Sequence, residues 1–414
     1  MKNKKKIKVL VLTSSFPKNK NDGVISFVKN QLLALKKYNQ NLDFFVLTPN
    51  LYSKHKEDVN SDYKIIRYRY FIKKYELINE KGIMTSLRNN YLLTFLLVPY
   101  FFSQIFNAIK ILNSYKPDIV YAHWITFQGI TALMLFKFFK IPYVLTTHAH
   151  DGTILLKIPI LGKLLLKKIV TNAVSWTADS EVTRNLTLKA IGNDKTSRNK
   201  SIVAPMFFDS ENYDTFEKNE YLYKNQLNTK YINILFVGRF TKKKGLEEFL
   251  ELFSEEFKEL KNLRLYIAGD GPLKSIYLKL IKKLGLNKYV KFIGYLNIEQ
   301  KKYYYSNCNF VIIPSIVTKS GDREGLPTVL LESMYNGSIT FSSLESNANE
   351  LITDGVNGFL FDFDDIKGSK EKLRNILYLD KTEIQKISAS AKEKVEIYKT
   401  ENIAKIFYNH LFKK

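Results

Sequence analysis

The sequence is poor in the residues that build disulfide and zinc frameworks, with one cysteine and five histidines in 414 residues. No disulfide can form within the chain, which fits a reducing compartment. We interpret Cys308 as a small buried hydrophobic residue. No short-period repeat or low-complexity tract is present, and the fractions of hydrophobic (45%) and charged (25%) residues are those of an ordinary folded protein.

Several catalytic motifs are also missing. The chain has no G-x-x-x-x-G-K-[ST] phosphate loop, no H-E-x-x-H, no G-x-S-x-G and no G-x-G-x-x-G after the first apolar run. Hydride transfer on a dinucleotide is therefore not favoured. The run Ile7–Leu12 is too short for the core of a secretion signal, and no small-residue cleavage site follows it. We expect it to be a buried first strand.

One segment, Tyr91–Leu112, is long enough to cross a bilayer. Pro99 lies near its middle, and Gln104, Asn107 and Lys110 interrupt its second half. We expect a core helix or a membrane-surface helix rather than a span.

Acidic residues are scarce relative to basic ones, and the formal net charge is +24. Such a charge calls for an anionic partner or surface. Nucleic acid, an anionic membrane face and phosphorylated substrates all satisfy this requirement, so charge alone does not choose among them.

Apolar, β-branched runs alternate with helical patterns along the whole chain, which predicts an α/β fold with parallel sheets covered on both faces. In the N-terminal half the expected strands are 8–12, 42–47, 118–121, 143–146 and 173–177. The polar stretch 209–230 predicts a connection between domains. A second series follows at 231–237, 263–268, 290–293, 310–313 and 339–342. We expect two domains in tandem, 1–208 and 225–396, with the ligand in a cleft between them.

Basic residues follow the expected strand 232–237. Gly238 and Arg239 end it, and Lys244 and Gly245 precede a helical pattern. A rigid bidentate donor, a point charge and a helix N-terminus suit a diphosphate. A solvated basic turn is an equally good interpretation of the spacing. The turn around Gly269 and Gly271 after the next strand permits close approach of a flat ligand, or is only a tight turn.

The most informative segment is 320–332, which follows the expected strand 310–313. Pro327 suits the first position of a helix, so that Glu324 lies just outside the helix and Glu332 inside it. Carboxylates are good acceptors for paired sugar hydroxyls and for a ribose diol. The alternative is that Glu324 only favours the helix dipole and Glu332 faces solvent.

Three histidines follow neighbouring strands, His123 after one and His148 and His150 after the next. Together with Asp151 they suggest a metal site, but the basic residues elsewhere make a metal-free diphosphate site more economical. Gly23 lies in a β–α turn where backbone can approach an anion. Asp362 and Asp364 resemble a metal-binding D-x-D pair, and we interpret them as a helix cap.

In order and spacing these motifs resemble those of the retaining glycosyltransferases of family 4. The sequence from Gly321 to Pro327 resembles that of members that build surface and capsular polysaccharides. The resemblance implies the GT-B fold, two Rossmann-like domains facing across a cleft, with a last helix at about 397–414 returning to the first domain. It implies a catalytic role for His148, Glu324, Arg239 and Lys244. It implies donor binding by Gly23, Gly238, Arg239, Lys244, Gly271, Glu324, Gly325, Leu326, Pro327, Thr328 and Glu332.

The sequence departs from the family pattern in two places. Members often carry Gly-Gly-x-Pro-Glu before the Asp-Gly-x-x-Gly turn, whereas only Glu350 of that pattern is present in 345–350. The usual His-Gly-Ser-Asp is replaced by His148-Ala149-His150-Asp151.

The resemblance predicts transfer of a sugar from a nucleotide-diphosphate sugar to an acceptor hydroxyl, without cofactor or metal. The lysine-rich N-terminus and the segment Leu155–Val170, which mixes apolar residues with lysines, suggest a lipid-linked acceptor and a cytoplasmic enzyme peripheral to the inner face of the membrane. Solvated lysines on a core helix are the alternative. A nucleotide-sugar epimerase of the same fold and a nucleic-acid-binding protein are the rival functions, and no nucleic-acid-binding motif is present.

Overall fold

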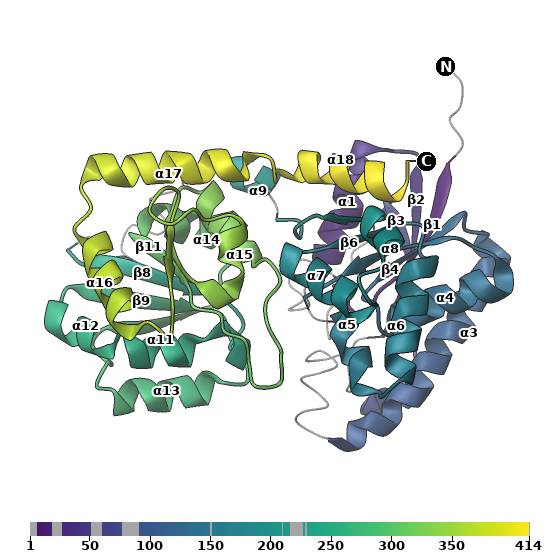
Figure 1. Cartoon of the computed structure of the whole chain (residues 1–414), viewed down its shortest axis with the longest axis horizontal. Coiled ribbons are helices and arrows are strands. Elements are labelled where there is room, and N and C mark those ends of the chain that lie inside the picture. The colour runs from purple at the N-terminus through teal and green to yellow at the C-terminus, as the bar shows by residue number, and fades with distance from the viewer. Residues whose placement is uncertain are drawn as a thin grey trace. The chain divides into compact units, whose positions relative to one another are not determined.

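The computed structural model describes residues 6–18, 27–50, 60–76, 91–149, 151–208, 210–215, 227 and 230–413. The chain forms two compact units, Met1–Phe207 with Ile403–Lys414, and Phe208–Asn402 (Figure 1). We call them unit 1 and unit 2.

Unit 1 is built on a seven-stranded sheet in the order β3-β2-β1-β4-β5-β6-β7, with every neighbouring pair parallel. The central strands are apolar runs that are buried from both faces, as expected for a parallel sheet, whereas the edge strand β3 is partly exposed. Their bounds are β1 Ile7–Leu12, β2 Leu42–Pro49, β3 Tyr63–Tyr68, β4 Ile119–His123, β5 Tyr143–Thr147, β6 Trp176–Ala178 and β7 Ser201–Val203.

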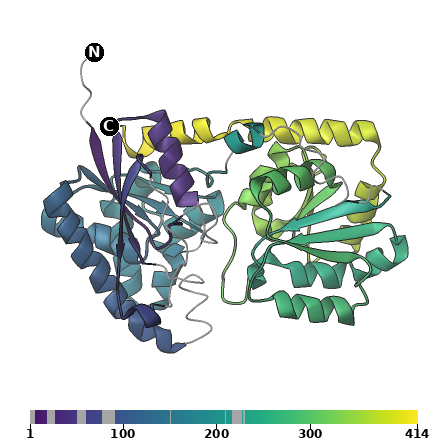
Figure 2. The same ribbon diagram turned by 180° about the vertical axis from the view of Figure 1, so that it is seen from behind.

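Helices cover both faces of this sheet. Figure 1 shows α3, α4 and α6 on one face, and Figure 2, from behind, shows α1 on the other. The bounds are α1 Phe27–Tyr38, η1 Lys73–Tyr75, η2 Tyr91–Leu96, α3 Leu97–Tyr115, α4 Phe127–Phe139, α5 Asp151–Ile154, η3 Leu155–Lys157, α6 Leu161–Asn172, α7 Glu181–Ala190 and α8 Lys195–Asn199.

The last helix, α18 (Thr400–Leu411), completes unit 1. It buries Ile403, Phe407 and Leu411, and the Phe407 ring lies 5.2 Å from that of Phe207. His410 Nε2 lies 3.1 Å from the Trp176 carbonyl oxygen, which anchors the end of the helix to β6.

Unit 2 is built on a six-stranded parallel sheet in the order β10-β9-β8-β11-β12-β13. Apolar clusters cover its two faces, one packed with Phe249, Phe253 and Tyr277 and the other with Tyr305, Leu330 and Met334. The strands are β8 Ile232–Val237, β9 Leu263–Ala268, β10 Val290–Gly294, β11 Phe310–Ile313, β12 Ile339–Ser343 and β13 Phe359–Phe361. The helices are α9 Ser210–Thr215, η4 Lys242–Lys244, α11 Leu246–Leu252, α12 Ser254–Leu260, α13 Lys274–Lys283, α14 Ile298–Asn307, α15 Thr328–Tyr335, η5 Leu344–Ser346, η6 Ala348–Glu350, α16 Ile366–Leu377 and α17 Lys381–Glu396.

The two-sheet α/β fold is confirmed, with two local corrections. Pro327 is the residue before α15 rather than its first residue, because its ψ of 128° is extended. The cap of α16 is Asp365, whose carboxylate accepts a hydrogen bond from the Gly368 amide, and not Asp362 or Asp364. Asp362 instead accepts a hydrogen bond from the Asp364 amide, which tightens the turn before the helix.

Candidate functional site

The basic residues expected to bind phosphate lie at the carboxyl edge of the sheet of unit 2. Gly238 and Arg239 end β8, and Arg239 is exposed. The chain then turns through η4, which carries Lys242, Lys243 and Lys244. Gly245 ends this turn with φ of +62°, and a Cβ added there would lie 1.7 Å from the Pro314 carbonyl oxygen. Only glycine therefore fits between η4 and the end of β11.

Two lysines of this turn hold the carboxylate of Glu324. Lys244 Nζ lies 3.3 Å from Glu324 Oε2, and Lys243 Nζ lies 3.4 Å from Oε1. Lys242 points elsewhere, to Glu247 and Glu248 on α11. The structure thus brings together Glu324, the residue expected to bind the sugar, and Lys244, a residue expected to bind phosphate. It adds Lys243, which the sequence motifs did not single out.

The charge state of Glu324 follows from this cluster. Burial alone would raise its pKa, but the ammonium groups of Lys243 and Lys244 outweigh burial and lower the pKa to about 2. The carboxylate is therefore ionised at every physiological pH. Its Oε1 is buried, and its partner among the described residues is the Lys243 ammonium group at 3.4 Å, an ion pair rather than a short hydrogen bond. An ionised, buried acceptor of this kind is suited to a ligand hydroxyl.

The loop that carries Glu324 is fixed from below by Asn347. Its side-chain amide donates to the carbonyl oxygens of Glu324, at 2.9 Å, and Gly325, at 3.2 Å. Asn347 has φ of +63°, a conformation that asparagine tolerates better than most residues. Counted back from Glu350, Asn347 stands where the family pattern carries a glycine. The asparagine that replaces this glycine adopts a left-handed conformation and anchors the loop through its side chain.

The residues after Glu324 form the wall of the loop and the start of α15. Gly325, Leu326 and Pro327 are buried, and Thr328 is partly exposed. Glu332 is buried rather than solvent-facing. Its Oε2 accepts a hydrogen bond from the Tyr305 hydroxyl at 2.8 Å and lies 3.1 Å from Lys301 Nζ, both on α14. No feature of the sequence pointed to these two partners, because α14 lies far away along the chain.

Gly271 is packed against backbone. With φ of +158°, its added Cβ would lie 2.7 Å from the backbone nitrogen and oxygen of Phe240. The turn after β9 therefore lies directly against the segment after β8. Gly238 is adjacent to the aliphatic part of Lys244, which would lie 3.5 Å from a Cβ at Gly238.

In unit 1 the structure brings two of the three expected histidines together at the carboxyl edge. His123 Nδ1 lies 3.3 Å from His148 Nε2, and the rings are stacked with 11° between their planes. Burial lowers the pKa of His148 to about 3 and that of His123 well below its usual value, so both are neutral at pH 7. The next residues, Trp124 and Ala149, have φ of +74° and +51°, a strained geometry that often marks functional sites.

Asp151 is buried below this pair. One carboxylate oxygen accepts from the Ile125 amide at 2.8 Å and the other from the Thr147 hydroxyl. Burial raises its pKa to about 7, although these hydrogen bonds oppose the rise. Asp151 thus links the backbone after β4 to the side chain of the last residue of β5, and neither of these hydrogen bonds involves an imidazole. Among the described residues no group of three or more histidines, cysteines and carboxylates is placed to hold a metal ion. Gly23 and His150 lie outside the described residues.

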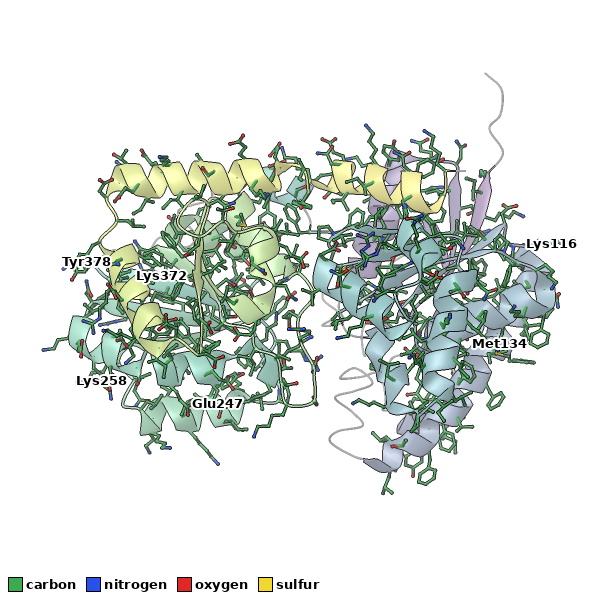
Figure 3. The ribbon with its side chains drawn as sticks, viewed as in Figure 1. Lys116, Met134, Glu247, Lys258, Lys372 and Tyr378 are labelled. Carbon is green, nitrogen blue, oxygen red and sulfur yellow. The ribbon has the colours of Figure 1, made fainter. Side chains whose placement is uncertain are left out.

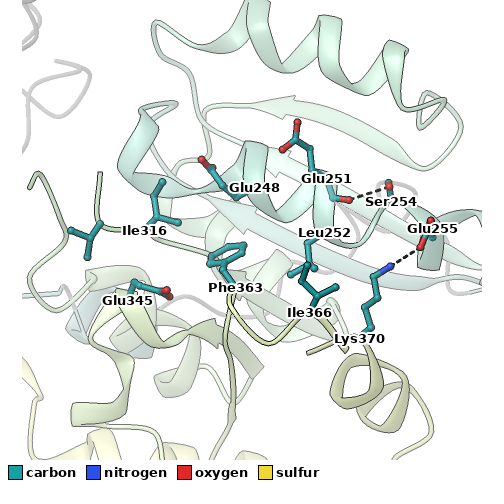
Figure 4. A pocket seen from close by; sticks show the side chains of 11 residues that line it. Glu248, Glu251, Leu252, Ser254, Glu255, Ile316, Glu345, Phe363, Ile366 and Lys370 are labelled. Atoms are coloured by element: carbon teal, nitrogen blue, oxygen red, sulfur yellow. Dashed lines mark hydrogen bonds and ion pairs between the residues drawn. The ribbon is translucent and has the colours of Figure 1, made fainter. Parts of the chain in front are cut away.

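A cavity of about 680 Å³ in unit 2 is a different feature (Figure 4). Its walls are acidic and apolar and include Glu248, Glu251, Glu345 and Phe363. Lys370, at its rim, is paired with Glu255 at 2.6 Å. This lining is unsuited to a diphosphate.

Two family models match the chain. One described as Glycosyl transferases group 1 matches residues 217–394, and one described as Glycosyltransferase Family 4 matches residues 22–209. Anabaena HepE, solved in complex with UDP, shares the fold with a TM-score of 0.68 at 16% sequence identity, over 97% of this chain and 99% of that one. The chain belongs to the glycosyltransferases of GT-B fold.

Curated relatives include bacterial polysaccharide enzymes. One is WcaL of Escherichia coli K12, which is provisionally named a colanic acid biosynthesis glycosyltransferase. It is 29% identical over 40% of this chain and 41% of its own length. An α-1,4-N-acetyl-D-galactosaminyltransferase of Campylobacter jejuni, named for an undecaprenol-diphosphate-linked acceptor, is 35% identical over 35% of this chain and 38% of its own length. These matches span well under half of each relative.

Proposed function

We propose that the chain transfers a sugar from a nucleotide-diphosphate sugar to an acceptor hydroxyl with retention of configuration. The observation that carries the proposal is the cluster of Glu324, Lys243 and Lys244, in which two ammonium groups keep a largely buried carboxylate ionised. Glu324 accepts hydrogen bonds from the sugar, Glu332 from the ribose, and Arg239 and Lys244 bind the diphosphate. The UDP bound by Anabaena HepE supports a nucleotide donor.

In the proposed reaction the acceptor oxygen attacks the anomeric carbon from the face that the diphosphate leaves. The bond between that carbon and the phosphate oxygen breaks, and the leaving oxygen takes the acceptor's proton. Fixed cations stabilise the charge that develops on the diphosphate. The low pKa of Glu324 makes it an acceptor of hydrogen bonds and not a proton donor. We assign His148, neutral and buried, to the reacting sugar.

The test compares lysines of the same turn. Lys244→Ala and Glu324→Ala should each reduce acceptor-dependent release of nucleoside diphosphate by about 10²–10³-fold. The first removes a fixed positive charge from the leaving diphosphate, and the second removes the carboxylate that orients the sugar. Lys242→Ala, whose ammonium group pairs with α11, should retain activity. Circular dichroism checks that the variants fold. Full activity of Glu324→Ala would refute the assignment, and donor turnover without acceptor would favour an epimerase.

We also propose that no metal is needed, because lysine and arginine side chains supply the positive charge at the donor phosphates. The expected outcome is that EDTA leaves initial rates unchanged and that added Mg²⁺ or Mn²⁺ does not raise them. A loss of activity in EDTA that Mn²⁺ restores would contradict this proposal.

We propose further that the acceptor is lipid-linked and that the enzyme works in the cytoplasm at the inner face of the membrane. The named acceptor of the Campylobacter jejuni relative supports a lipid carrier. The lysines at 157, 163, 167 and 168 are exposed, whereas Leu166, Ile169 and Val170 on the other side of α6 are buried.

A further inference from the structure

One face of η2 and α3 is an exposed apolar stripe. Its members recur every three or four residues and so lie on one side of the helix. They are Leu92 (55% exposed), Phe95 (78%), Val98 (60%), Phe102 (64%) and Phe106 (60%). Soluble monomers rarely expose such a contiguous apolar surface without a binding role. We call these residues the α3 stripe.

The opposite side of α3 is fixed in the core of unit 1. Gln104 Nε2 donates to the Thr131 hydroxyl at 2.7 Å, and the Tyr68 hydroxyl donates to Gln104 Oε1 at 3.1 Å. The helical stretch Leu92–Tyr115 is long and apolar enough to cross a membrane, and most of it is not buried in unit 1. Crossing would require α3 to leave these partners, whereas contact with a membrane surface would not.

A second apolar feature precedes α6. Ile160 is 81% exposed, and Ile158, Leu161 and Leu164 are exposed beside it. Ile160 has φ of 57° and ψ of −62°, and the Leu161 amide donates to the Pro159 carbonyl at 2.5 Å. This is a γ-turn of the rare, strained kind, and a β-branched residue in it is unusual. We call these residues the 158–161 turn. In this strained turn the Ile160 side chain is exposed to solvent.

Both features lie toward the carboxyl edge of the sheet. Because α3 ends just before β4 begins, its C-terminus is at the amino edge and its N-terminal half, with the α3 stripe, is toward the opposite edge. The start of α6 also lies toward the carboxyl edge, because α6 leads into β6 and so ends at the amino edge. Helix α4 lies between them and packs against both (Figure 1). His123 is the last residue of β4 and His148 is the first residue after β5, so both histidines lie at this same edge.

The charge around these features is one-sided. Residues 81–178 contain only two acidic residues, Asp118 and Asp151. Asp151 is buried, and Asp118 accepts a hydrogen bond from the Lys8 amide. The exposed lysines beside these features are Lys110, whose Nζ lies 5.1 Å from the centre of the Phe106 ring, and Lys157, Lys163, Lys167 and Lys168. Lys116, Lys137 and Lys140 are also exposed but lie toward the amino edge, where α3 and α4 end (Lys116 is labelled in Figure 3). Aromatic side chains flanked by lysines, with hardly any acid, complement anionic lipid headgroups.

We propose that unit 1 binds an anionic bilayer surface through the α3 stripe and the 158–161 turn, which insert between headgroups while the lysines contact them. The occupant is a lipid surface, since the lysines around both features match its charge. This inference rests on the proposed function, because it would bring the histidine edge to the membrane where a lipid-linked acceptor lies. The inference adds the aromatic α3 stripe to the lysines of the N-terminus and of α6, on which the proposed membrane association was based.

The test is flotation of the full chain with vesicles, without donor or acceptor. The chain should bind phosphatidylcholine vesicles that contain phosphatidylglycerol, and less at high salt. The double variant Phe102→Ser with Phe106→Ser should bind at least about ten-fold more weakly, because it lacks two aromatic rings that the bilayer would bury. Tyr378→Ser, which removes an equally exposed aromatic ring (77%) from unit 2, should bind like the wild type (Figure 3).

A charge-reversal pair separates local from overall electrostatics. Lys163, Lys167 and Lys168 changed to Glu should weaken binding far more than Lys381, Lys386 and Lys394 changed to Glu, although both triples alter net charge equally. A Phe102→Trp reporter should shift its emission to the blue on vesicles and be quenched by brominated lipid. Unchanged binding of the Phe102/Phe106 variant would overturn the inference, as would a change of oligomeric state in that variant, which would assign the stripe to a second copy.

The two proposals fail separately. If vesicle binding is absent but a nucleotide sugar is still turned over with a soluble acceptor, the membrane inference is wrong and the transferase proposal stands. If vesicles bind through the α3 stripe but no nucleotide sugar shifts the melting temperature or is consumed, the transferase proposal is wrong.

Discussion

At the scale of single residues, buried titratable groups are held in charge states that their positions dictate. Glu324 is largely buried, with 12% of its side chain exposed, but it is ionised because two ammonium groups lie within 3.4 Å of its oxygens. His123 and His148 are neutral, because burial disfavours the charged imidazolium form of each ring. Asp151 lies between these cases, since hydrogen bonds only partly offset its burial.

Asp151 predicts a pH dependence of stability. Its pKa is raised from 3.8 to about 7 on folding, so its contribution is fully present below pH 3.8 and is lost as pH rises through 7. The wild type should therefore gain stability relative to Asp151→Asn as pH falls from about 7 to about 4, by on the order of a few kcal/mol. Urea unfolding of unit 1 at several pH values measures the difference.

The buried histidines act in the opposite direction. Their pKa values are lowered on folding, so the stability they permit is present above pH 6.5 and is lost as pH falls. Both enzymes carry these histidines, and their effect cancels in the comparison. A constant difference between wild type and Asp151→Asn from pH 7 to pH 4 would show that Asp151 does not titrate in this range.

At the scale of elements, the site depends on how closely η4 approaches the end of β11. The Ile316 amide donates to the Lys243 carbonyl oxygen at 2.9 Å, so the lysine turn and the glutamate loop are joined through backbone. Gly245 makes this approach possible. The distance from Lys244 to Glu324 is thus set by packing of backbone segments and not by the lysine side chains alone.

Two glycines with similar backbone angles test this view. Gly245→Ala should destabilise unit 2 strongly and reduce activity, because the new methyl group would overlap the Pro314 carbonyl. Gly321→Ala, at φ of +80° with open space around it, should cost only the strain of a left-handed residue, about 1 kcal/mol. Denaturant unfolding of both variants provides the comparison. Equal losses would mean that conformation, and not the approach of η4 to β11, makes Gly245 necessary.

The sequence predicted the long central strands, because they are continuous apolar runs between helical patterns. It missed β3, which alternates polar and apolar residues at the edge of its sheet, and β7 and β13, which have three residues each. It placed Glu324 with basic residues but assigned no role to Lys243, one of three consecutive lysines. Lys301, Tyr305 and Asn347 were beyond prediction, since only the tertiary fold brings them to Glu332 and to the loop.

At the scale of the whole molecule, each unit has its own sheet and its own core, but unit 1 is not continuous in sequence. Residues 403–414 belong to it although 208–402 form the other unit. The side chains of Ile403, Phe407 and Leu411 are almost completely buried in unit 1. The stability of unit 1 therefore depends on the last residues of the chain.

Two neighbouring residues of α18 test this dependence. Phe407→Ala should destabilise unit 1 by about 3–5 kcal/mol, because a fully buried ring that contacts Phe207 is lost. Ile406→Ala, on the exposed side of the same helix (41% exposed), should have little effect. Calorimetry should show the unit 1 transition moving down in temperature while the unit 2 transition stays. A shift of both transitions together would contradict independent units.

The place of α18 has a consequence for biosynthesis. A ribosome delivers residues 1–207 first, yet they lack the helix that contacts Phe207 until residues 403–414 have been translated and have left the exit tunnel. Unit 2 is complete before that moment. We therefore expect the second unit to reach its native state on the nascent chain while the first is still waiting for its last helix, the reverse of the usual N-to-C order of domain folding.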